Sequence, residues 1–309
     1  MKRIVIRIIT YNQEKYVGRA LDSVLQQKDW GLFRVIVCDD CSKDRTWEII
    51  QKYKSKYPDI FDIYRNDHNL GIYENVEKAD GYIPDCDLIG SLSGDDEYCD
   101  GYFEAVQKMI EEASIDTTEA VGIYADWKNV KPNGTETVFC QDKVLLGYSA
   151  WELKLRGLII NRSLLISKKV KDGFKKNIFE KGLRVAESNY DAQKALNISK
   201  MYYCPVVATI YYSGIGVSKH LNLKESDYYT TQGIEKWKFL VNHYITKERD
   251  LNFAKYEILK AEYYMAPTWK KFFKLMIYFH KGQLPRCYPS FTVVIGTFLE
   301  LMRYKICFK

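Results

Sequence analysis

The chain has 309 residues, of which 47% are apolar and 28% charged, and its 46 Lys and Arg exceed its 40 Asp and Glu by six. This composition is typical of a folded protein with domains of roughly 100 to 200 residues, and it excludes disordered and collagen-like chains. The positive excess is local, because residues 268–309 hold eight Lys or Arg and one acid, Glu300. The other 38 basic and 39 acidic side chains nearly balance, so we expect no nucleic-acid partner.

Short apolar strands alternate with helical patterns over the first third of the chain, and the strands begin 29, 27 and 26 residues apart. This spacing is close to the roughly 30 residues of a βαβ unit and predicts an α/β fold with a mostly parallel sheet. In such sheets ligands bind at the carboxyl ends of the strands. We expect the strands at residues 4–9, 33–38, 60–64 and 86–92, and polar clusters follow three of them at residues 10–12, 39–42 and 93–96.

The regular alternation weakens beyond about residue 120. Strand-like stretches remain at residues 121–127, 158–166 and 206–212, whereas residues 221–282 have a helical pattern. The sequence therefore predicts a helical C-terminal extension to the α/β part.

The first apolar run is interrupted by Arg7, and no small-residue cleavage site follows it, so we interpret it as a strand and not as a signal peptide. Only Cys38 and Cys41, among eight cysteines, have a metal-like or redox-like spacing. No second pair completes a zinc site. We therefore expect unpaired thiols in a reducing, cytoplasmic compartment.

Adjacent carboxylates, Asp95 and Asp96, follow the fourth strand after Gly94. Two neighbouring carboxylates repel each other, and a divalent cation between them relieves that repulsion. Mg²⁺ or Mn²⁺ held by one or two carboxylates and by substrate phosphates is the expected arrangement. A solvated turn is the alternative.

The second strand ends at Asp39 and Asp40, and Tyr11 follows the first. A carboxylate at this position can accept a hydrogen bond from a base or a ribose, or it can cap the following helix. A Tyr ring can stack on a base or pack in the core. The chain has no G-x-G-x-x-G after its first strand and no P-loop motif, so a bound nucleotide must be held mainly by a metal and side chains.

These motifs, taken together, resemble the family-2 glycosyltransferases of the GT-A fold. The resemblance covers residues 1 to about 115 and rests on residues 10–14 (TYNQE), 20–27 (ALDSVLQQ), 37–46 (VCDDCSKDRT) and 92–98 (LSGDDEY). It implies a Rossmann-like sheet flanked by helices and an inverting, metal-dependent transfer of a sugar from a nucleotide-diphosphate donor. The acceptor hydroxyl would belong to a glycan or a lipid-linked acceptor in bacterial capsule or O-antigen synthesis.

The resemblance also implies a division of the chain and roles for its residues. Residues 1–219 would form the catalytic domain, with a donor half at 1–115 and an acceptor half at 116–219, followed by a helical region at 220–309. UDP is the favoured nucleotide, because Asp39 can accept from the imide N–H of uracil. Ser93 replaces the leading acid of the family's motif, so Asp96 is the expected main ligand of Mn²⁺ or Mg²⁺, supported by Asp95. The donor would be held by Thr10, Tyr11, Asn12, Glu14, Asp39, Asn69, Gly71 and Asp95.

Residues 184–191 (RVAESNYD) resemble the segment that supplies the family's catalytic base, although Ser188 replaces its second acid. Glu187 and Asp191 are therefore both candidates, and four residues apart on a helix they would share a face. We favour Glu187. A solvated helix start is the alternative.

The basic tail at residues 268–309 begins with a predicted amphipathic helix, whose Lys270, Lys271, Lys274 and Lys281 form a narrow face opposite aromatic and aliphatic residues. Residues 291–299 add a second apolar stretch that is shorter than a membrane span. Both features predict a tail that lies on an anionic membrane, with the protein peripheral on the inner face of the cell membrane. A helix packed on the core is the alternative.

Two other functions remain open at this point. The replacement at Ser188 is compatible with an inactive GT-A-fold protein that binds nucleotide sugars or glycans. A nucleotidyltransferase is the other alternative, although the chain lacks the early Gly-rich, basic loop that this chemistry requires.

Overall fold

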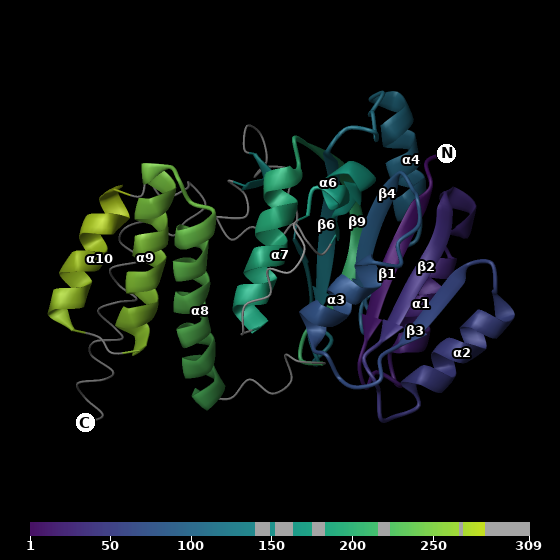
Figure 1. Ribbon diagram of the computed structural model, residues 1–309, viewed down its shortest axis with the longest axis horizontal. Helices are drawn as coiled ribbons and strands as arrows, with labels where there is room; N and C mark the ends of the chain where they lie inside the picture. The colour runs from purple at the N-terminus through teal and green to yellow at the C-terminus, as the bar shows by residue number, and fades with distance from the viewer. Residues whose placement is uncertain (140–148, 152–162, 175–182, 216–222, 266–267, 282–309) are drawn as a thin grey trace. The chain divides into compact units, whose positions relative to one another are not determined.

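The computed structural model describes residues 1–139, 149–151, 163–174, 183–215, 223–265 and 268–281 (Figure 1). The chain divides into two compact units. One comprises Met1–Asn177 and Asp191–Lys219, and the other comprises Ile178–Tyr190 and His220–Lys309.

The first unit is built on one mixed sheet, whose strands lie in the order β3-β2-β1-β4-β8-β6-β9-β5, with β7 paired to β6. The strands β1, β2, β3 and β4 run parallel to one another, as their spacing predicts, and β6 runs parallel to β9. Antiparallel pairing joins β8 to β4 and β6, β5 to β9, and β7 to β6. The strands are β1 (Ile4–Thr10), β2 (Leu32–Asp39), β3 (Phe61–Arg65), β4 (Leu88–Ser93), β5 (Glu97–Tyr98), β6 (Val121–Val130), β7 (Glu136–Phe139), β8 (Leu165–Ser167) and β9 (Lys200–Tyr212).

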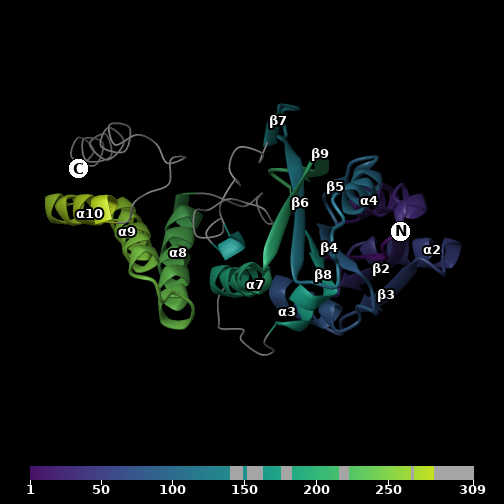
Figure 2. The same cartoon turned by 90° about the horizontal axis from the view of Figure 1, so that it is seen from above.

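Helices cover both faces of this sheet, because alternate strand residues point to opposite sides. In β1, Ile4, Ile6 and Ile8 pack with α1 (Val17–Leu25), α2 (Thr46–Lys56) and α4 (Tyr102–Glu112). Val5 faces the other layer, formed by α3 (Ile72–Asp80), α6 (Lys168–Asp172) and the C-terminal part of α7 (Leu183–Asn197) (Figure 2). The α/β prediction is confirmed. Most of the strand predicted at 158–166 lies outside the described residues, and β8 begins at Leu165.

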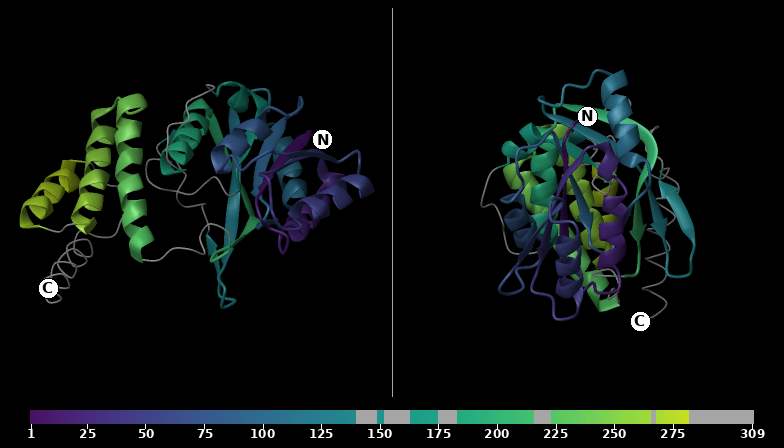
Figure 3. Two further views of the ribbon diagram at one scale, coloured as in Figure 1. Left: turned by 60° about the horizontal axis from the view of Figure 1, so that its bottom comes forward. Right: turned by 90° about the vertical axis from the view of Figure 1, so that its right-hand side faces the viewer.

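In the second unit, three helices pack in chain order, α8 (Leu223–His243) against α9 (Glu248–Met265) and α9 against α10 (Trp269–Lys281) (Figures 1 and 3). Trp237 of α8 meets Phe253 of α9 edge to face, with ring centroids 5.5 Å apart. The predicted helical extension is therefore present. None of the helices described here is long and apolar enough to cross a bilayer.

Candidate functional site

The carboxyl ends of three neighbouring strands meet at one edge of the sheet. Thr10, the last residue of β1, pairs with Asp39 at the end of β2. On the other side of β1, Ile9 pairs with Ser93 at the end of β4. The sheet therefore brings the three predicted polar clusters to the same edge, which is where ligands bind in open α/β sheets.

Asp39 is fully buried and organises two of these loops. Its carboxylate accepts hydrogen bonds from Thr10 Oγ1 at 3.1 Å, from Ser42 N at 3.0 Å and from Ser42 Oγ. Arg65 Nε lies 3.3 Å from Oδ2. A carboxylate offers about four lone-pair sites, so three hydrogen bonds and one ion pair leave little room on it. A nucleoside binds Asp39 directly most readily if one of these groups moves.

The loops after β1 and β2 are joined by reciprocal hydrogen bonds. Asn12, with a positive φ of 52°, donates its N–H to Ser42 Oγ at 2.9 Å and accepts from Lys43 N at 2.8 Å. Glu14 Oε2 likewise accepts from Arg45 N at 3.1 Å. Asn12 and Glu14 thus shape the loop, whereas Tyr11 is 44% exposed beside them and has a ring face available for stacking.

Asp40, which our sequence analysis left out of the site, holds the loop that precedes α3. Its Oδ1 accepts from Leu70 N and its Oδ2 from Gly71 N, both at 2.8 Å. Asn69 Nδ2 reaches the Asp40 backbone oxygen at 3.5 Å, and Gly71 has a φ of 85°, which favours glycine. Asn69 and Gly71 therefore lie beside the other donor-site candidates. The sequence signal for the contact between Asp40 and this loop is the presence of a second acid at the end of β2.

The predicted metal carboxylates lie in a tight turn between β4 and β5. Asp96 N donates to Ser93 O at 3.0 Å, which closes the turn. Gly94 is buried, and a Cβ there would meet Gln13 Oε1 at 2.4 Å and Thr10 Cγ2 at 2.6 Å. Asp95 and Asp96 are both partly buried. The turn is thus pressed against the end of β1.

The end of β9 contacts this turn directly. Arg19, a residue that the sequence motifs did not indicate, contacts the same turn from α1. Tyr212 N donates to Asp96 Oδ1 at 3.3 Å, and the Tyr212 hydroxyl donates to Glu97 Oε1. Burial and that hydrogen bond raise the pKa of Tyr212 to about 12, so its hydroxyl keeps its proton at neutral pH. Arg19 Nη2 donates to Asp95 O at 2.9 Å.

The carboxylate oxygens of the turn are suitable ligands for a hard divalent cation. Among the described side chains, no group of three or more His, Cys, Asp or Glu could hold a metal ion. Mg²⁺, however, is commonly held by one or two carboxylates together with substrate phosphates and water. Asp96 and Asp95 are therefore a suitable pair for a cation that arrives with a diphosphate.

The two candidate bases differ in what the structure shows of them. Both lie on α7, and the side chain of Glu187 falls outside the described part of the chain. Asp191 Oδ1 lies 3.6 Å from Lys194 Nζ. Burial lowers the pKa of Lys194, and the Asp191 carboxylate opposes that shift. Asp191 is therefore a counter-ion of a buried lysine.

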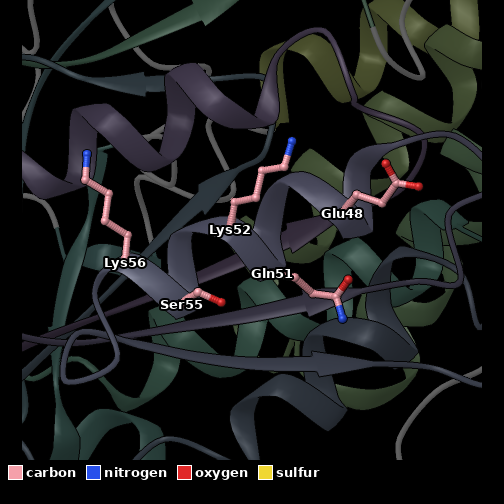
Figure 4. A pocket seen from close by; sticks show the side chains of 5 residues that line it. All are labelled: Glu48, Gln51, Lys52, Ser55 and Lys56. Atoms are coloured by element: carbon pink, nitrogen blue, oxygen red, sulfur yellow. The ribbon is translucent and has the colours of Figure 1, made fainter.

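A hollow of about 600 Å³ on the surface of the first unit is lined only by exposed residues of α2, among them Glu48, Lys52 and Lys56 (Figure 4). No residue of the three strand-end loops lines it. It is therefore separate from the candidate site.

Comparison with known proteins identifies the family. The profile named "Glycosyl transferase family 2" matches residues 5–175, which is more than half of the chain. The chain belongs to this family.

Curated relatives match shorter segments. Poly(ribitol-phosphate) beta-N-acetylglucosaminyltransferase TarS of Staphylococcus aureus (strain Mu50 / ATCC 700699) is 41% identical over 58 residues, 18% of this chain and 10% of that protein. The chondroitin synthase of Pasteurella multocida (strain Pm70) is 32% identical over 136 residues, 43% of this chain and 13% of that protein. Matches to mycobacterial proteins cover 20% of their length. In these relatives, the aligned part is thus a fifth of the protein or less.

Solved structures share the fold at low sequence identity. The crystal structure of S. aureus TarS 1-349 in complex with UDP-GlcNAc has a TM-score of 0.62 at 16% identity, covering 92% of this chain and 82% of that one. The mannosyltransferase PcManGT from Pyrobaculum calidifontis, in complex with GDP-Man and Mn²⁺, has a TM-score of 0.54 at 15% identity, with coverages of 98% and 81%. The predicted GT-A glycosyltransferase fold is confirmed.

Proposed function

We propose that this protein transfers a sugar from a nucleotide-diphosphate donor, preferably a UDP-sugar, to a hydroxyl of a glycan or lipid-linked acceptor, with inversion. The main support for this proposal is that one edge of the sheet holds Tyr11, the Asp39 and Asp40 loops and the Asp95–Asp96 turn. The membership in glycosyl transferase family 2 supports this chemistry. The activities for which TarS and chondroitin synthase are named support a role in polysaccharide synthesis.

In the proposed reaction, Glu187 accepts the proton of the acceptor hydroxyl. The acceptor oxygen forms a bond to the anomeric carbon on the face opposite the diphosphate, and the bond from that carbon to the diphosphate oxygen breaks with its electron pair. Tyr11 stacks on the base, and the loops held by Asp39 and Asp40 enclose the nucleoside. Asp96 and Asp95 would hold Mn²⁺ or Mg²⁺, which, when bound, neutralises charge on the leaving diphosphate.

The donor assignment is tested by thermal unfolding of the full chain with UDP, GDP, CDP or dTDP, each with and without Mn²⁺. We expect UDP with Mn²⁺ to raise the Tm most. A ligand at 100 times its Kd stabilises the folded state by about 2.7 kcal/mol, which sets the size of the expected shift. Asp96→Asn should lose the Mn²⁺-dependent part of the shift and at least about 100-fold of the transfer rate, because a bound cation supplies several kcal/mol. A wild-type Tm that no nucleotide changes would exclude this donor site.

A second candidate function is binding of a nucleotide sugar or glycan without turnover. Two observations favour it, namely Ser188 in the base segment and the pairing of Asp191 with Lys194. Donor hydrolysis by the wild type that is lost in Glu187→Gln, while the Tm shift by UDP is kept, supports the enzyme. Stabilisation by UDP without hydrolysis or transfer supports the binding protein.

A further inference from the structure

Helix α10 divides its apolar residues between two faces. Phe272 and Leu275 are 8% and 0% exposed, and the Phe272 ring meets Tyr263 of α9 with centroids 6.3 Å apart. Trp269, Phe273 and Ile277, by contrast, are 52%, 63% and 54% exposed. Of the apolar residues opposite the predicted lysine face, one part therefore packs on α9 and another part faces outward.

The outward residues form a stripe, because they lie four residues apart along the helix. At about 100° per residue, Phe273 and Ile277 lie about 40° and 80° around the axis from Trp269. Exposed Lys270 and Lys274 follow at about 100° and 140°. The Trp269 and Phe273 rings lie with centroids 6.2 Å apart, so the stripe presents a continuous apolar surface with a basic edge.

We propose that this stripe docks the protein on the surface of an anionic lipid bilayer. Trp, Phe and Ile would enter the boundary between headgroups and acyl chains, where an indole ring is well accommodated. The lysine edge is complementary to lipid phosphates, and long lysine stems allow the ammonium groups to reach them. The α9 side of the helix keeps its packing, so docking requires no rearrangement of α10.

This docking would hold the enzyme as a peripheral protein on the cytoplasmic leaflet, whose anionic lipids attract basic segments. It goes beyond the proposed transfer reaction and does not depend on it, because vesicle binding is measured without substrate.

The test is co-sedimentation of the full chain with vesicles of phosphatidylcholine alone or with about one third phosphatidylglycerol. We expect binding to the anionic vesicles only. Lys270→Gln with Lys274→Gln should weaken it by about 25-fold, because each lysine near the surface contributes about 5-fold. Lys52→Gln with Lys56→Gln is the matched control, since these exposed lysines of α2 have the same spacing (Figure 4).

A double substitution of the stripe, Phe273→Ser with Ile277→Ser, should also abolish binding while the Tm stays within about 2 °C, because both side chains are exposed. Equal losses in the two lysine pairs would overturn the proposal. A full chain that does not bind anionic vesicles would also overturn the proposal. The same holds if the stripe instead joins two copies of the chain, so that the protein does not bind vesicles and becomes monomeric in the Phe273→Ser, Ile277→Ser variant.

A different observation concerns Arg19 on α1, which connects three segments of the candidate site. Its guanidinium lies over the Tyr212 ring, with Cζ 3.7 Å from the centroid. Its Nε lies 2.7 Å from Glu97 Oε1, as an ion pair whose N–H is not aligned on that oxygen. Together with the Nη2 hydrogen bond to Asp95 O, these contacts join Arg19 to the backbone between the two acids and to the side chain of the residue that follows them.

We infer that Arg19 is a positioning residue for the Asp95 and Asp96 carboxylates, an inference that rests on the proposed function. It would lower the cost of bringing the two carboxylates around a cation. Arg19→Met should raise the Mn²⁺ concentration for half-maximal stabilisation by UDP about 10-fold, and Arg19→Lys should restore part of the loss. Arg34→Met is the control, because Arg34 pairs with Asp62 at 3.5 Å elsewhere in the sheet.

The readout is the Tm, so it does not depend on turnover. An unchanged Mn²⁺ midpoint in Arg19→Met, with a normal wild-type response, would overturn the positioning role alone. A wild type without any response to UDP and Mn²⁺ would overturn the proposed function and this role together.

Discussion

Lys194 is a largely buried cation, with 12% of its side chain exposed, and its neighbours determine what Asp191 can do. The Asp191 carboxylate faces it at 3.6 Å, and Arg7 and Asp80 also act on the Lys194 pKa, which burial lowers from 10.5. Arg7 forms an ion pair with Asp80, and Lys171 Nζ lies 3.4 Å from the other Asp80 oxygen. Removing one acid from such a group leaves a buried charge without its counter-ion.

We therefore expect Asp191→Asn to act on stability and Glu187→Gln on turnover. Asp191→Asn should lower the free energy of unfolding at pH 7 by about 1 to 3 kcal/mol. Because Asp191→Asn depresses the Lys194 pKa further in the folded state, this loss is fully present at pH 7 and shrinks as pH rises towards 10.5. Glu187→Gln should instead reduce transfer at least about 100-fold. Urea unfolding at pH 7 and pH 10 and a transfer assay separate the two; the reverse pattern would make Asp191 the base.

At the same scale, the sequence predicted where reactive side chains gather but not how each is used. Acids after strands indicated Asp39 and the Asp95–Asp96 turn correctly as neighbours. The sequence did not indicate that three hydrogen bonds and an ion pair surround the Asp39 carboxylate, because Thr10 and Arg65 lie far from it in sequence. Arg19 was missed for the same reason, since its partner Asp95 is 76 residues away and no motif spacing joins them.

At the scale of elements, Gly94 determines how closely the β4–β5 turn approaches β1. We expect Gly94→Ala to cost about 1 to 3 kcal/mol, because its Cβ would overlap Gln13 and the methyl group of Thr10. The same change should weaken binding of Mn²⁺ and UDP, since the turn carries Asp95 and Asp96. Chemical unfolding and the nucleotide-dependent Tm measure both effects.

Gly18→Ala provides the matched control, because it lies inside α1 and its Cβ would meet only the Tyr53 hydroxyl, at 3.7 Å. It should leave binding unchanged and raise stability by up to about 1 kcal/mol. Equal effects at the two positions would mean that the packing at Gly94 does not matter for the site.

The elements themselves were predictable where pairing is regular and less so where it is not. The first four strands follow one another at βαβ spacing, so their existence and direction could be inferred. The position of β8 between β4 and β6 could not, because a three-residue antiparallel strand leaves little periodic signal. The register between β9 and β6 shifts at Ala125 and Asp126 of β6. These irregularities interrupt the alternation of side chains between the two sheet faces that marks a strand. For α10, no feature of the sequence distinguishes the apolar residues that α9 covers from those that stay exposed.

At the scale of the whole molecule, the candidate donor site is built from loops of the first unit, whereas α8, α9 and α10 belong to the second. A bound ligand slows hydrogen exchange of those backbone amides that can exchange only when the ligand-binding region opens. We therefore expect UDP with Mn²⁺ to slow hydrogen exchange up to about 100-fold, for ligand at 100 times its Kd, in residues 10–14, 39–46, 66–71 and 93–98.

The same experiment should leave exchange in α8, α9 and α10 within about 2-fold of the free protein, because those helices unfold locally without disturbing the strand-end loops. Mn²⁺ added to UDP should give further slowing mainly at residues 93–98, which carry the two predicted ligands, and the Asp96→Asn variant should lose that further effect. Protection that is strongest in α8, α9 and α10 would place the nucleotide outside the loops at the carboxyl ends of β1, β2 and β4. Protection that spreads evenly over both units would instead mean that the two units open as one cooperative body, contrary to their division into separate compact units.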